Sequence, residues 1–141
     1  MHIRTKAAVV VALLSLILFG GNAHAQTIQY IAKDIALKSG ESTELGDVYF
    51  ITSNCKSVLK ATPEVEILDG PPGVTAVINA AKVIPHGYGC ANPVAGGKLL
   101  ISAKDVQEYS LTRMVLRVRY ETLDGPRQRM ESVNLALFPV N

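Results

Sequence analysis

The spacing of apolar and polar residues from Ile28 onward is that of β-strands rather than helices. Apolar side chains alternate with polar ones or form short β-branched runs, and Gly, Pro, Asp and Asn separate these runs. Two connecting segments, 54–62 and 103–110, are compatible with a helical turn, the second beginning at Asp105. Seven strands are predicted, at residues 28–37, 44–51, 64–68, 74–83, 98–104, 113–122 and 127–138.

Each predicted strand offers one apolar face that has to be covered. The alternation is clearest between residues 113 and 122, where Met114, Leu116, Val118 and Tyr120 share a face. Seven short strands, separated by turns at intervals of about 8–15 residues, favour two packed sheets over one open sheet. The predicted fold is all-β, a two-sheet antiparallel β-sandwich.

The segments Gly96-Gly97-Lys98-Leu99-Leu100-Ile101 and 116–125 resemble strands of bacterial immunoglobulin-like domains of exported proteins. The resemblance covers roughly the last third of the chain and implies an immunoglobulin-like sandwich. The cysteine pair that joins the two sheets of antibody domains is missing, because Cys55 and Cys90 fall in predicted loops. We predict that Gly96 and Gly97 form a turn leading into the strand at Lys98. The resemblance transfers no functional residue.

The first 25 residues have the pattern of a cleavable secretory signal peptide. Arg4 and Lys6 precede an apolar run from residue 7 to residue 19, and Ala23-His24-Ala25 provides a cleavage site before Gln26. About 13 apolar residues make a helix of roughly 20 Å, too short to cross a hydrocarbon core of about 30 Å. We therefore expect a single exported domain, residues 26–141, periplasmic or secreted and not inserted in the membrane. The short signal and the absence of an Asn-x-Ser/Thr sequon favour a bacterial origin.

The charge of the mature chain argues against nucleic acid as a partner. The full chain has 14 basic and 12 acidic residues, and cleavage removes Arg4 and Lys6 but no acid, so the mature net charge is near zero. Nucleic-acid-binding domains usually carry a strong basic excess.

Cys55 and Cys90 are the only two cysteines, and in an oxidising compartment they are expected to pair. A metal site or a reactive thiol pair is the alternative, but the 35-residue separation is unlike a CxxC motif. The mature chain also has only one histidine, His86. The sequence therefore predicts a disulfide and no metal site.

No catalytic motif is present. A Gly-x-Ser-x-Gly elbow and phosphate-binding glycine loops are absent, and both thiols are assigned to the disulfide. Glu64 and Glu66 alternate along one strand face, where a solvated face explains them. We expect no enzyme activity and no cofactor. A small hydrolase or metal-handling protein built on His86 stays open as an alternative.

Two groups of residues are candidate binding surfaces. The first is the loop predicted at 84–97, where His86 and Tyr88 offer polar groups and an aromatic face next to Cys90. Its alternative is a loop that only covers the core. The second consists of Arg117, Arg119, Arg127 and Arg129, which are expected to share a face and attract acidic partners.

Cross-strand ion pairs offer another explanation for these arginines. A three-residue hairpin loop would pair Arg119 with Glu131 and Arg129 with Glu121, and we take these ion pairs as the better explanation.

The function predicted from the sequence is non-catalytic binding of a protein or cell-envelope component. A subunit of a surface or pilus-like assembly is the alternative. It rests on residues 132–138, where Val133, Leu135 and Leu137 alternate in the way of a strand donated to a neighbour.

Overall fold

The protein is an all-β domain in the computed structural model, which describes residues 33–141. Its elements are β1 Lys33–Lys38, β2 Ser42–Val48, β3 Glu64–Asp69, β4 Val74–Val83, β5 Val94–Ala103, β6 Ser110–Thr122 and β7 Gly125–Phe138. The predicted strand number is confirmed for the described residues 33–141, and β4 has the predicted bounds. Within these residues neither 54–62 nor 103–110 contains a helical turn, and no helix is long and apolar enough to span a membrane. The signal peptide at 1–25 and residues 28–32 of the first predicted strand lie outside the described part.

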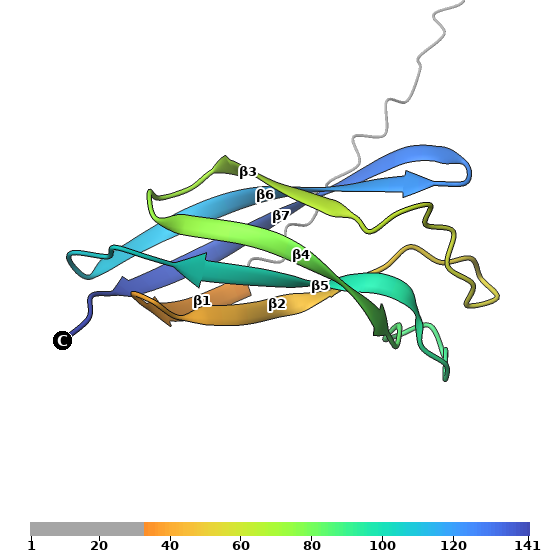
Figure 1. The fold of residues 1–141 in the computed structure, drawn as a ribbon, viewed down its shortest axis with the longest axis horizontal. Helices are drawn as coiled ribbons and strands as arrows, with labels where there is room; N and C mark the ends of the chain where they lie inside the picture. Colours follow the sequence, from red (N-terminus) through yellow and green to blue (C-terminus); the bar gives the residue numbers. More distant parts are fainter. Residues whose placement is uncertain (1–32) are drawn as a thin grey trace, which may run out of the picture.

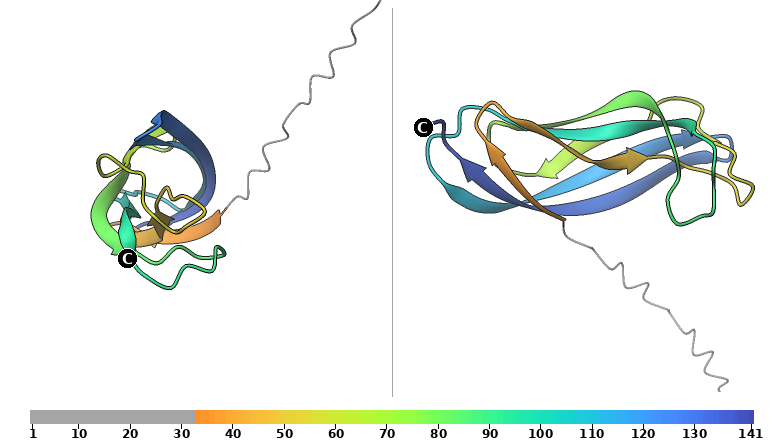
Figure 2. Two further views of the ribbon diagram at one scale, coloured as in Figure 1. Left: turned by 90° about the vertical axis from the view of Figure 1, so that its right-hand side faces the viewer. Right: turned by 90° about the horizontal axis from the view of Figure 1, so that it is seen from below.

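The seven strands form two sheets that pack face to face along the long axis of the molecule (Figure 1, Figure 2). One sheet has the order β1-β7-β6-β3 and the other β2-β5-β4. The third, sixth and seventh strands therefore share one sheet and the second, fourth and fifth share the other, as in immunoglobulin sandwiches. The prediction of an antiparallel sandwich holds for every strand pair except one, because β1 runs parallel to β7.

The space between the sheets is filled by the alternating apolar side chains. Met114, Leu116, Val118 and Tyr120 of β6 are at most 2% exposed, which confirms the predicted inner face of this strand. Leu99 and Ile101 of the facing β5 are equally buried. The two sheets thus form a single core.

Gly96 and Gly97 lie inside β5, so the predicted turn at this position is wrong. A Cβ atom on Gly96 would lie 2.4 Å from the carbonyl oxygen of Val48, and one on Gly97 would lie 2.4 Å from Cγ2 of Ile78. The glycines allow the neighbouring strands to approach closely and do not mark a turn. Consequently the loop before β5 ends at Pro93 and is shorter than predicted.

The alternation at residues 132–138 is explained by the protein's own core. β7 lies between β1 and β6, and Val133, Leu135 and Leu137 are at most 3% exposed. These side chains pack within the same chain.

Candidate recognition site at the disulfide end

Three connections meet at one end of the sandwich. They are the segment 49–63 after β2, the segment 84–93 after β4, and the β6–β7 hairpin (Figure 1). Cys55 in the first segment is bonded to Cys90 in the second, with a Cα–Cα distance of 5.7 Å, which confirms the predicted disulfide. The hairpin is fixed to the first segment by backbone hydrogen bonds, from Leu123 N to Val58 O at 3.0 Å and from Lys60 N to Glu121 O at 2.8 Å. These bonds tie all three connections together.

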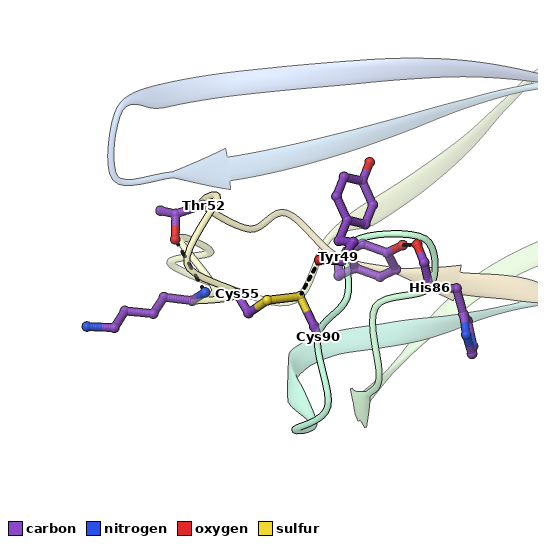
Figure 3. Close-up of a disulfide and its surroundings, with 7 residues drawn as sticks. Tyr49, Thr52, Cys55, His86 and Cys90 are labelled. Atoms are coloured by element: carbon purple, nitrogen blue, oxygen red, sulfur yellow. Dashed lines mark hydrogen bonds between the residues drawn. A yellow bond between two sulfur atoms is a disulfide. The ribbon is translucent and has the colours of Figure 1, made fainter.

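A tight turn presents Cys55 to its partner (Figure 3). Thr52 N donates to Lys56 O at 2.9 Å, and Cys55 N donates to Thr52 O at 3.0 Å. Cys55 adopts φ 60°, a left-handed conformation that costs a non-glycine residue roughly 1–2 kcal/mol. The disulfide and the two hydrogen bonds keep the residue in this conformation.

The second segment rests on Tyr49. The Tyr49 hydroxyl donates to the carbonyl oxygen of His86 at 3.4 Å (Figure 3). The rings of Tyr49 and Tyr88 meet edge to face, with centroids 6.3 Å apart. The oxidised Cys90 sulfur has no proton to donate, so its 3.9 Å approach to the Tyr88 carbonyl is a packing contact. Tyr88 is still 67% exposed and the His86 side chain 83% exposed. Both predicted binding residues therefore present their side chains to solvent.

A hollow of about 410 Å³ opens beside Tyr88. The rings of Phe50 and Tyr120 pack edge to face in its wall, with centroids 5.5 Å apart. Four aromatic residues and one aliphatic residue make up the apolar lining: Tyr49, Phe50, Ile51, Tyr88 and Tyr120. Asp47, Gln128 and Arg129 supply the polar lining.

Charges around this hollow are arranged in pairs. Lys98 Nζ lies 2.7 Å from Glu44 Oε1 and 3.1 Å from Asp47 Oδ1, and these hydrogen bonds raise the pKa of Lys98. His86 Nε2 is 4.0 Å from the other oxygen of Asp47. Arg129 pairs with Glu131 on the same strand. The rim therefore offers both charge signs to a ligand.

Tyr120 lies deeper than the other tyrosines of the hollow and is 2% exposed. Burial raises the pKa of its hydroxyl, and the nearby charge of Arg129 opposes that shift in part. The hydroxyl therefore stays protonated at neutral pH.

The second predicted group of binding residues is divided between two faces. Arg117 and Arg119 project outward from β6 and both contact Glu66 Oε2, at 3.3 and 3.0 Å. Arg127 and Arg129 pair with the inward-facing Tyr120 and Val118, so they lie on the opposite side of the sheet. The expectation that the four arginines share one face is wrong.

The predicted ion pairs are also wrong, because the hairpin loop has two residues. Thr122 pairs with Gly125, which places Arg119 opposite Gln128 and Glu121 opposite Pro126. The register differs by three residues from the predicted one, so neither Glu131 nor Glu121 meets the expected arginine.

Sequence reasoning missed Asp47, Tyr49 and Tyr120 as members of the site, and it assigned Arg129 to the other candidate surface. A signal was present for Tyr49, because an aromatic pair at 49–50 shortly precedes Cys55 just as Tyr88 shortly precedes Cys90. The predicted disulfide brings these two segments together. For Arg129 the correct hairpin length would have been needed.

Among residues 33–141 no group of three or more His, Cys, Asp and Glu side chains is placed to hold a metal ion. His86 has a single carboxylate neighbour, and the nearby sulfurs are oxidised. No family model, curated protein or solved structure matches the chain.

Proposed function

We propose that the protein is an exported, non-catalytic binding domain that recognises a protein or cell-envelope component with its disulfide end. The observation that carries this proposal is the aromatic hollow of about 410 Å³, which lies beside the exposed Tyr88 and next to two segments joined by the Cys55–Cys90 disulfide. Tyrosine is favoured at binding sites because it offers a large amphipathic surface with few rotatable bonds.

Rigidity supports the same proposal. Disulfide, edge-to-face aromatic contacts and backbone hydrogen bonds fix the segments at 49–63 and 84–93 relative to each other. Loops that are ordered before binding lose less conformational entropy when a partner arrives. The bonded state of Cys55 and Cys90 also fits an oxidising compartment, which supports export together with the N-terminal sequence pattern.

The proposal is tested by capture from envelope extracts. The immobilised protein is compared with the double variant His86→Ala/Tyr88→Ala and with Val77→Ala. Val77 is the control because it is 48% exposed in β4 of the other sheet and lies outside the three connections of the disulfide end. We expect a component retained by the wild type and by Val77→Ala but lost from the double variant. Equal retention by all three proteins would contradict the assignment of this end.

A further inference from the structure

A second exposed surface lies on the outside of the β1-β7-β6 sheet, toward the opposite end of the molecule. Leu135 and Leu137 face the core, so the residues between and beside them in β7 face outward. Ala36 and Ala136 are paired neighbours there, and Leu111 pairs with Ala136 while being 72% exposed. An open hollow of about 650 Å³ lies over this part of the sheet.

The outward side chains form three rows across the strands. The two inner rows, read from β1 through β7 to β6, are Asp34-Asn134-Arg113 and Ala36-Ala136-Leu111. The third contains Lys38 and Phe138, and the Tyr109 ring extends it at 5.0 Å from the Phe138 ring. The β1 member of each row complements the member on the β6 side, which in the third row is Tyr109 just before β6: acidic against basic, small against large, and cationic against aromatic.

We propose that this face binds the same face of a second copy of the chain, about a two-fold axis nearly parallel to β7. Such a rotation places β7 of one copy over β7 of the other, and it places β1 of each copy opposite β6 of the other. Asp34 then meets Arg113 of the second copy, and Ala36 meets Leu111 of the second copy. Lys38 meets Tyr109 of the second copy, and each contact occurs twice because the interface is isologous.

The self-complementarity of this face identifies a second copy of the chain as its partner. In the isolated chain Asp34 accepts a hydrogen bond from Asn134 Nδ2 at 2.8 Å, and Arg113 forms no ion pair with another residue of the described range 33–141. The dimer supplies the opposite charge to Arg113, fits the Leu111 side chain over an alanine, and sets the Lys38 ammonium against an aromatic ring. The two-fold operation brings no like charges of these rows together.

The geometry is compatible with ordinary sheet packing. Aligned sheets pack about 10 Å apart with strands crossing at about 30°, which an axis inclined by roughly 15° to β7 produces. Because the axis follows the strands, the disulfide ends of both copies point in the same direction. The dimer would therefore present two recognition ends side by side to a surface and gain from bivalent attachment.

The experiment is analytical ultracentrifugation of the protein and of charge and leucine variants across a concentration series. We expect a reversible dimer with a dissociation constant of about 1–100 µM, the strength of a small interface. Leu111→Asp should weaken association at least about 100-fold through an unpaired buried charge. Leu123→Asp is the matched control, because Leu123 is 67% exposed in the hairpin at the other end.

Exchanging the charges of Asp34 and Arg113 tests the proposed pairing more directly. Asp34→Arg and Arg113→Asp each place like charges opposite one another, so each variant alone should be monomeric. Mixing the two variants restores both ion pairs, and so does combining both substitutions in one chain. Circular dichroism verifies that each variant is folded.

Three results would overturn the proposal: a wild-type protein that stays monomeric at millimolar concentration, equal effects of Leu111→Asp and Leu123→Asp, or no heterodimer on mixing. The proposal is also overturned if the protein is monomeric and Leu111→Asp lowers its free energy of unfolding more than Leu123→Asp does. In that case the chain itself covers this face.

Discussion

Removing the disulfide with Cys55→Ala/Cys90→Ala should destabilise the protein without changing its fold. The bond closes a loop across a sequence separation of 35 residues, and loop-closure entropy for such a length gives about 4 kcal/mol at 25 °C. The substitution does not remove the strain of the left-handed backbone at residue 55, because alanine at φ 60° is as strained as cysteine. We therefore expect a loss of roughly 2–5 kcal/mol in the free energy of unfolding, a large share of the 5–15 kcal/mol typical of native proteins.

Urea unfolding at 25 °C measures this loss, with far-ultraviolet circular dichroism for the strands and tyrosine fluorescence for the core, because the chain contains no tryptophan. Wild-type protein treated with a reductant is the control and should unfold at the same urea concentration as the variant. The β spectrum of the folded variant should equal that of the wild type, because the core strands do not contain either cysteine. A loss below about 1 kcal/mol, or a loss of β structure without urea, would refute the reasoning.

Three further predictions concern the core and the site. Gly97→Ala should lower the free energy of unfolding by about 1–3 kcal/mol in the same urea assay, because the new methyl group meets Ile78 at 2.4 Å. Above pH 10.0, the ordinary tyrosine pKa, stability should fall. The unfolded chain releases the Tyr120 proton at a lower pH than the folded protein does. Ionisation therefore stabilises the unfolded chain first, and the free energy of unfolding falls as the pH rises from the unfolded to the folded pKa of Tyr120. Tyr120→Phe should remove that part of the alkaline loss in unfolding measured against pH. The double variant His86→Ala/Tyr88→Ala should change stability by no more than about 0.5 kcal/mol, the usual range for exposed sites, and a loss of several kcal/mol in thermal unfolding would make the segment a packed cover.

The parts of the fold that the sequence predicts are those governed by local periodicity. The alternation from Met114 to Tyr120 identifies an inner face because successive side chains of a strand point to opposite sides. The pairing of Cys55 with Cys90 follows from counting, since only two cysteines are present.

The errors concern contacts between strands. Gly97 signals a turn when it is considered locally, and only the position of Ile78 on the neighbouring strand shows that a side chain has no room there. The partners of Arg119 depended on a hairpin loop whose length was predicted as three residues instead of two. The hollow at the disulfide end brings together residues from β2, β6, β7 and two loops, and no local pattern reports such a combination.

The most direct test of the recognition site is photo-crosslinking in the living cell. A photoreactive amino acid replaces Tyr88 in one variant and the control residue Val77 in another, since both side chains are exposed. The account predicts that irradiation attaches a defined envelope component at position 88 and leaves position 77 without it. Identical products at both positions, or no product at position 88, would contradict the claim that the disulfide end binds a partner.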